Sequence, residues 1–144
     1  IARRLVICAS EDVGNADPQA LLVATAAQQA VEFVGLPECR LPLAQATVYV
    51  ACAPKSNASY LGIEKAMKDV ESGKTLEVPE HLKDANYSGA ERLGHGKGYK
   101  YAHSYPGHIV KQAYLPEKKR YYEPTDQGFE RELKARLLRK SSRS

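Results

Sequence analysis

The fold is indicated most clearly by residues 17–34, whose sequence is DPQALLVATAAQQAVEFV. Asp17-Pro18 is a helix start signal, because an Asp N-cap accepts a hydrogen bond from the first turn and Pro lacks the N–H that would stay unpaired at the next position. The positions that follow at helical spacing are Leu21, Leu22, Thr25, Gln28, Val31 and Val34. Alanines between them favour the helix and leave room for other helices to approach. Gly35 and Pro37 stop the run, so we predict a helix over residues 18–34.

Residues 1–8, IARRLVIC, also have helical spacing, with Ile1, Leu5 and Cys8 on one face. No Ser, Thr, Asp or Asn precedes this face as an N-cap. We therefore expect the chain to begin within a helix and to be a piece of a longer protein.

A third helix is predicted over residues 38–53. Its inward positions are expected to be Leu43, Ala46, Val50 and Ala53. Residues 47–50, TVYV, have the composition of a short strand, but the apolar stretch is too long for a buried strand and a helix is favoured. Pro54 ends this helix.

Ser56 is placed to cap a fourth helix over residues 57–72, which Gly73 ends. The apolar positions of this helix are Tyr60, Ile63, Met67 and Val70. Four antiparallel helices with short connections predict an all-α fold whose core is a helical bundle over residues 1–73.

The second half of the chain has a different character. Residues 1–72 carry six Lys or Arg and eight Asp or Glu, whereas residues 73–144 carry fifteen and nine. Between Lys74 and Gln127, Gly and Pro are scattered and no period is sustained, which predicts a long irregular segment. Its many tyrosines argue against disorder, because aromatic rings supply buried area.

A short last helix is predicted over residues 128–140. Its apolar face is expected to contain Phe129, Leu133 and Leu137. We expect residues 74–140, the irregular segment and this helix, to pack on the same domain as the bundle, and residues 141–144 to form a loose tail.

The cysteines and the hydropathy pattern indicate the cellular location that we expect. Cys8, Cys39 and Cys52 lie among apolar residues and form no C-x-x-C pair, so we expect buried free thiols and a cytosolic protein. No apolar run is long enough for a membrane span, and no secretory signal pattern is present.

Residues 93–101, LGHGKGYKY, are the segment most similar to a phosphate-binding loop. Such a loop requires G-x-x-x-x-G-K-[ST] between a strand and a helix, but Lys97 is followed by Gly and no strand is predicted before it. A tight turn that depends on Gly94, Gly96 and Gly98 is favoured.

No catalytic, cofactor-binding or metal site is predicted in this chain. The histidines, His81, His95, His103 and His108, lack the spacing of an H-E-x-x-H site and have no Cys nearby. No G-x-S-x-G nucleophile motif occurs either. We expect that the chain alone is not an enzyme.

Cations and aromatic rings are mixed in the same part of the chain. The candidate nucleic-acid-binding residues are Arg92, Lys97, Tyr99, Lys100 and Tyr101, with His95 and His103 nearby. Cations can contact phosphates while rings stack on bases. The alternative is a solvated basic loop whose tyrosines pack on the bundle, and we expect residues 118–122, KKRYY, at the surface.

Several strings, taken in order, resemble the C-terminal region of the RarA/MgsA family of AAA+ ATPases, which includes the Werner-interacting proteins of eukaryotes. They are ARRL (2–5), ASEDVGNADP (9–18), LAQA (43–46), VACAPKSN (50–57), VPEHL (78–82) and GKGYKY (96–101). The resemblance covers nearly the whole chain, and the second and fourth strings are the most specific.

The resemblance implies a domain similar to the collar of clamp-loader subunits, following an ATPase core that would hold ATP and Mg²⁺ outside this chain. It also implies homotetramers that form chiefly through this region. The partners it implies are DNA at stalled replication forks and single-strand-binding protein, in the cytoplasm of bacteria and associated with the nucleoid.

Two hypotheses about function follow. In the first, the bundle is an oligomerisation module of an ATPase that acts in replication-fork maintenance and recombination, with the helices over residues 18–34 and 38–53 as candidates for packing. In the second, the basic, tyrosine-rich second half is a nucleic-acid-binding module.

Overall fold

The computed structural model describes residues 1–73 and 76–142. These residues form five α-helices and no β-strand. The helices are α1 (Ala2–Cys8), α2 (Gln19–Val34), α3 (Arg40–Cys52), α4 (Ala58–Glu71) and α5 (Glu130–Ser142). The all-α prediction is confirmed, and residues 47–50 lie inside α3 rather than in a strand. Residues 143–144 of the expected loose tail lie outside the described range.

The chain divides into two compact units. The first contains residues 1–67 and 121–136, and we call it the helical unit. The second, the loop unit, contains the described residues of 68–120 and 137–144.

The start of α2 has the predicted cap. Asp17 has extended backbone angles, and its Oδ1 accepts a hydrogen bond from the Gln19 N–H at 3.0 Å. Asp17 Oδ2 accepts a second bond from the Tyr49 hydroxyl at 3.0 Å, which ties the start of α2 to α3 and raises the pKa of Tyr49. Gly35 ends α2 with a φ of +66°, a conformation that suits glycine.

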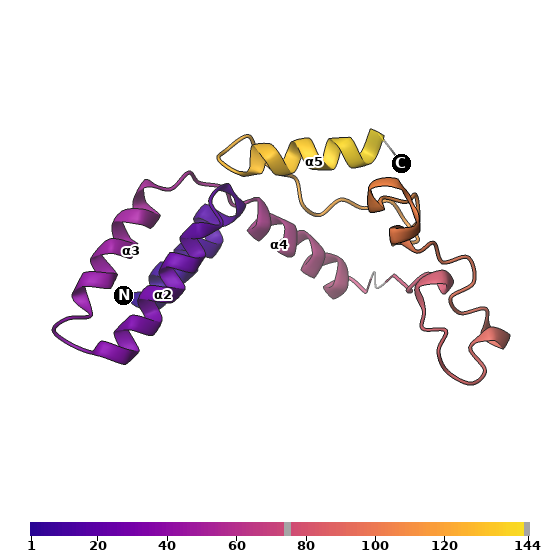
Figure 1. The fold of residues 1–144 in the computed structure, drawn as a ribbon, viewed down its shortest axis with the longest axis horizontal. Coiled ribbons are helices and arrows are strands. Elements are labelled where there is room, and N and C mark those ends of the chain that lie inside the picture. Colours follow the sequence, from indigo (N-terminus) through magenta and orange to yellow (C-terminus); the bar gives the residue numbers. More distant parts are fainter. Residues whose placement is uncertain (74–75, 143–144) are drawn as a thin grey trace. The chain divides into compact units, whose positions relative to one another are not determined.

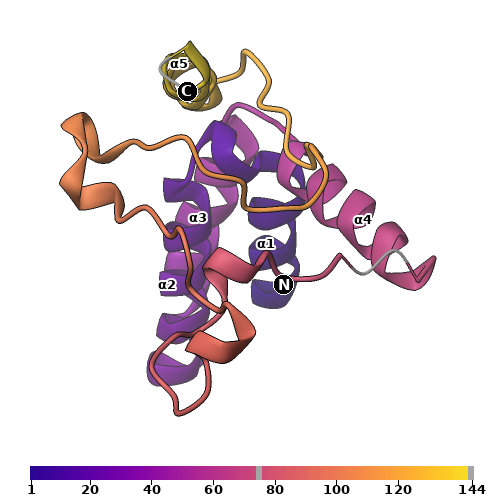
Figure 2. The same cartoon turned by 90° about the vertical axis from the view of Figure 1, so that its right-hand side faces the viewer.

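In the helical unit, α1, α2 and α3 pack against one another, with α2 and α3 running side by side (Figures 1 and 2). Their core is built mainly from small side chains. It contains Ala9, Val13, Ala20, Ala24, Val50 and Ala53. Small side chains let the helix backbones lie close together, so little room remains between the helices for large ones.

The larger apolar side chains of α2 and α3 face away from this core. Leu22 is 62% exposed, Phe33 91%, Leu41 68% and Val48 63%. On α3, the predicted inward positions Ala46, Val50 and Ala53 are buried, and Leu43 is half-buried. On α2 the buried positions are the alanines Ala20, Ala24 and Ala27.

The prediction that α4 packs as a fourth antiparallel helix is wrong, since α4 does not lie along α1, α2 and α3. Its buried residues are Ala58 and Gly62. A Cβ on Gly62 would lie 3.4 Å from the Tyr121 carbonyl oxygen, so this face meets the segment that returns toward α5. The expected apolar positions are exposed instead, and they are Tyr60, Ile63, Met67 and Val70.

A π-helical turn follows α1 in the chain and is hydrogen-bonded to the residues just before α4. This turn covers Ala9–Val13 and is followed by a 3-10 turn over Gly14–Ala16. The Ser56 N–H donates to the Asp12 carbonyl at 2.8 Å. Gly14 has a φ of +52°, and a Cβ there would lie 2.7 Å from the Ser56 carbonyl oxygen, so the close approach requires glycine.

The loop unit confirms the predicted irregular segment. Its described residues between 76 and 120 contain neither an α-helix nor a strand, only short 3-10 turns. These turns are Glu80–Leu82, Glu91–Leu93, Ala102–Ser104 and Pro106–His108. Gly94, Gly96 and Gly98 all have positive φ, as the predicted tight turn requires.

Candidate functional surfaces and a buried carboxylate

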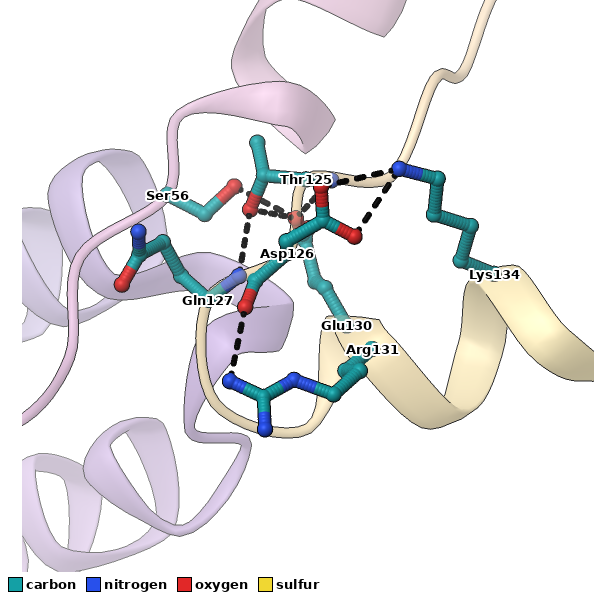
Figure 3. Close-up of polar contacts among 7 residues, drawn as sticks. All are labelled: Ser56, Thr125, Asp126, Gln127, Glu130, Arg131 and Lys134. Atoms are coloured by element: carbon teal, nitrogen blue, oxygen red, sulfur yellow. Dashed lines mark hydrogen bonds and ion pairs between the residues drawn. The ribbon is translucent and has the colours of Figure 1, made fainter.

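The helical unit contains one charged side chain that is fully buried among the described residues, that of Glu130 at the first position of α5. Its Oε2 accepts hydrogen bonds from the Ser56 hydroxyl, the Thr125 hydroxyl and the Thr125 N–H, each at 2.7 Å (Figure 3). Its Oε1 accepts a bond from the Tyr122 hydroxyl at 2.8 Å. Four donors therefore surround one carboxylate.

These donors decide the charge of Glu130. Burial alone would raise the pKa of its carboxyl, because it disfavours the charged form. The hydrogen bonds from Ser56, Thr125 and Tyr122 outweigh burial and hold the pKa of Glu130 below its ordinary value. The site is therefore built around a carboxylate anion, at a helix N-terminus where the macrodipole also favours negative charge.

A second layer of contacts holds this site in place. Asn15 Nδ2 donates to Ser59 Oγ at 3.1 Å and to the Tyr122 hydroxyl oxygen at 3.3 Å. The Phe129 N–H donates to the Ala16 carbonyl at 2.8 Å. Residues 121–130 are thereby bound to the turn after α1 and to the start of α4.

Sequence reasoning identified Ser56 as a cap, and this is confirmed, because its Oγ accepts a bond from the Ala58 N–H at 3.3 Å. It missed Glu130, Tyr122 and Thr125. An acidic residue in the first turn of an exposed, charged helix is usually a solvated one, and its partner Ser56 is distant in sequence. No local pattern marks Glu130 as buried.

The helical unit exposes large apolar side chains around the connection from α2 to α3. Phe33, Val34, Leu36 and Leu41 lie within nine residues of one another and are 91%, 46%, 83% and 68% exposed. We call these four residues the α2–α3 apolar patch. Single exposed apolar residues are normal on a protein surface, but grouped large ones mark interaction surfaces.

In the loop unit, the predicted nucleic-acid-binding residues are all exposed. These residues are Arg92, Lys97, Tyr99, Lys100 and Tyr101. Lys97, Tyr99, Lys100 and Tyr101 follow one another in a single stretch, and Arg92 lies in the 3-10 turn Glu91–Leu93 before it. Tyr99 and Tyr101 are 52% and 58% exposed.

His95, by contrast, belongs to a local structural cluster. Its Nδ1 pairs with the Tyr87 hydroxyl at 2.6 Å, and its Nε2 lies 3.3 Å from Glu80 Oε2. The Gly96 N–H donates to the Glu80 carbonyl at 2.8 Å. Lys83, which also pairs with this carboxylate, lowers the pKa of Glu80. These contacts close the loop from residue 80 to residue 96.

The cysteines differ in exposure. Cys39 is buried and Cys8 half-buried, but Cys52 is exposed, which corrects the expectation that all three are buried. The Asp12 side chain beside Cys8 raises the pKa of that thiol, which disfavours the thiolate.

The described residues gather no group of three or more His, Cys, Asp or Glu side chains that could hold a metal ion. Within the same ranges, no helix has the length and hydropathy to cross a bilayer.

Comparison with known proteins places these features in context. A family model described as MgsA AAA+ ATPase C terminal matches residues 1–141. An uncharacterised AAA-domain protein of Mycobacterium tuberculosis is 51% identical over 142 residues, which cover 96% of this chain and 31% of the relative.

Two relatives carry the name replication-associated recombination protein A. The protein of Bacillus subtilis is 49% identical, over 93% of this chain and 33% of the relative. The protein of Coxiella burnetii is 45% identical, over 95% of this chain and 32% of the relative. The chain thus spans about a third of the length of these relatives.

Proposed function

This chain belongs to the family of MgsA AAA+ ATPase C-terminal domains and does not itself include the ATPase core, and from that premise we propose that it is the oligomerisation domain of such an ATPase. In this proposal it joins its own copies as a homotetramer, in the manner of a clamp-loader collar. The observation that carries the proposal is the α2–α3 apolar patch.

The patch supports association because its side chains are large, apolar and close together in sequence, while the core of α1, α2 and α3 is made of small ones. Phe33 and Leu36 are 91% and 83% exposed, so almost all of their apolar surface meets water in a single chain. Burial of such surface contributes about 25 cal/mol per Å². A second copy that covers the patch would recover this free energy.

The proposal extends to the complete protein. Relatives named replication-associated recombination protein A support a role for the complete protein in recombination that is associated with replication. We propose further that it acts on DNA at replication forks, together with single-strand-binding protein, in the cytoplasm and with the nucleoid. ATP and Mg²⁺ would be bound by an ATPase core outside this chain. The domain described here would set the number and arrangement of those cores.

Size-exclusion chromatography with light scattering tests the oligomerisation proposal. The 15.9 kDa chain should elute with the mass of about four copies, and Phe33→Glu and Leu41→Glu should each shift it toward the monomer at unchanged helix content by circular dichroism. Gln19→Glu, an exposed change at the other end of α2, is the matched control and should leave the mass unchanged. A chain that stays monomeric at high concentration would refute the proposal.

A second candidate function is nucleic-acid binding by the loop unit. The observation that favours it is that Arg92, Lys97 and Lys100 are exposed and form no ion pair within the described residues. Charge reversal of Lys97 and Lys100 should weaken binding to labelled DNA and lower the slope of log affinity against log salt by about 2. Absence of any binding at low salt would exclude this function.

A further inference from the structure

The loop unit contains a segment in which basic residues are hardly balanced by acidic ones. Residues 92–120, which we call the basic-aromatic segment, contain seven Lys or Arg and a single Asp or Glu, a net of +6. Lys119 is bound to Asp69 at 2.6 Å. The other cations form no ion pair within the described residues, and they are Arg92, Lys97, Lys100, Lys111, Lys118 and Arg120. Their charge is therefore available to an anionic partner.

The same segment exposes aromatic rings. Tyr99 is 52% exposed, Tyr101 58% and Tyr114 60%. The Tyr101 ring lies 5.1 Å from that of His103, and the His103 ring lies 4.8 Å from that of His108. The three rings form a continuous group, which we call the ring cluster, and both histidines are exposed.

Two hydrogen bonds of Lys100 close the loop that contains the ring cluster. The Lys100 N–H donates to Gln112 Oε1 at 2.8 Å, and Lys100 Nζ donates to the Lys111 carbonyl at 3.2 Å. These contacts close the loop that carries the rings. Inside it, His108 has a φ of +55°, which is uncommon for a residue other than glycine and brings its ring to His103.

Exposed rings beside cations that form no ion pair match the chemistry of unstacked nucleic-acid bases with their phosphates better than that of duplex DNA. Unstacked bases can lie on aromatic faces while the backbone phosphates meet Lys and Arg. In duplex DNA the bases already stack on one another, and sequence reading there uses an element that enters the major groove. The described basic-aromatic segment has no α-helix or strand to do so.

We propose that the basic-aromatic segment binds single-stranded DNA, with bases stacked on Tyr99, Tyr101 and the histidines of the ring cluster and phosphates on Lys97, Lys100 and Lys111. This inference rests on the second proposed function and deepens it by naming the strand state of the ligand and the stacking residues. It is independent of the oligomerisation proposal, which concerns the helical unit.

Fluorescence anisotropy with the complete chain tests the proposal. The probes are labelled oligo(dT) and oligo(U) of about 30 nucleotides, long enough for several sites, and a blunt duplex of the same length. Oligo(dT) should bind more tightly than the duplex. Tyr99→Ala with Tyr101→Ala should weaken oligo(dT) binding by about fivefold or more, since the loss of a stacking ring has that size, whereas binding to the duplex should change little.

The matched control is Tyr99→Phe with Tyr101→Phe, which keeps both rings and should bind as tightly as the unchanged chain. A second variant, His103→Ala, removes the central ring of the cluster and should also weaken oligo(dT) binding. Equal affinity for oligo(dT) and duplex, tighter binding of oligo(U) than of oligo(dT), or no effect of the alanine variants overturns the single-strand proposal while leaving nucleic-acid binding intact. Failure to bind all three probes at low salt overturns both.

Discussion

The Ser56 hydroxyl donates a hydrogen bond to Glu130 Oε2 at 2.7 Å and, through its oxygen, accepts one from the Ala58 N–H at 3.3 Å. One hydroxyl thus joins the first turn of α4 to the first residue of α5. Glu130 is fully buried, so its charge depends on this bond and on those from Thr125 and Tyr122. Loss of this carboxylate should therefore weaken the attachment of residues 121–136 to the rest of the helical unit.

Substitution of Glu130 by Gln tests this dependence. In Gln, an NH₂ group replaces one acceptor oxygen of the carboxylate. This group donates hydrogen bonds and cannot accept them, so the donors that face it lose their acceptor. We expect Glu130→Gln to lower the free energy of unfolding by about 2–4 kcal/mol, since hydrogen bonds to a charged group and unpaired buried donors both contribute at this scale. Urea denaturation followed by circular dichroism measures the change.

The matched control is Glu132→Gln, two residues further along α5. Glu132 is exposed and pairs with the exposed Arg136 at 3.2 Å, so its loss should change stability by less than about 0.5 kcal/mol. Equal effects of the two substitutions would mean that the buried hydrogen bonds of Glu130 contribute nothing specific.

The lowered pKa of Glu130 predicts a pH dependence with a definite sign. Its folded pKa lies below the value of 4.5 for a free Glu, so the unfolded state binds more protons and stability rises with pH through this range. The contribution is complete above the unfolded pKa and is lost as pH falls through the folded one. Other carboxylates also titrate here, so the test compares urea midpoints of the unchanged chain and Glu130→Gln at about pH 7 and about pH 3. The unchanged chain should lose more stability on acidification.

Gly128 should be intolerant of any side chain. Its φ is +48°, and a Cβ there would lie 2.1 Å from the Ala16 carbonyl oxygen and 2.7 Å from Pro54 Cγ. Gly128→Ala would push Phe129 away from Ala16 and break their hydrogen bond, so we expect a loss of about 3 kcal/mol or more. Gly35 has a similar φ of +66° with no atom near its Cβ position.

Gly35→Ala therefore separates backbone strain from crowding. It should cost about 1–3 kcal/mol and less than Gly128→Ala, because its φ of +66° and ψ of −172° lie in a region that residues with a Cβ rarely adopt. Comparable losses for the two variants, measured by urea denaturation, would show that the contact with Ala16 is not tight.

The positions of the helices could be predicted from the sequence because their signals are local. Asp17, Gly35 and Ser56 act within a few residues of themselves, and each does what its pattern predicts. The irregular segment could be predicted for the same reason, since Gly94, Gly96 and Gly98 set their own backbone. The recognised family strings agree with the family match over residues 1–141.

The inner and outer faces could not be predicted in the same way. Helical spacing groups Leu22 and Val34 with other apolar side chains, yet both are exposed, because α1, α2 and α3 pack so closely that alanines occupy the core. A pattern of apolar residues does not distinguish a core face from an interface. The Glu130 site could not be predicted, because Ser56 and Tyr122 approach Glu130 only in the folded structure.

Two alanines of α2 test whether small side chains are required at the core. Ala24 is fully buried where α2 meets its neighbours, whereas Ala26, two residues later, is exposed. Ala24→Leu must push helices apart or adopt a strained rotamer, so we expect a loss of about 2–3 kcal/mol. Ala26→Leu should stay within about 0.5 kcal/mol, because Leu is nearly as good a helix former as Ala. Both are measured by thermal and urea unfolding at low protein concentration, where association does not contribute. If Ala24→Leu were as stable as Ala26→Leu, the core would have room for larger side chains, and the exposure of Phe33 and Leu41 would no longer follow from close helix packing.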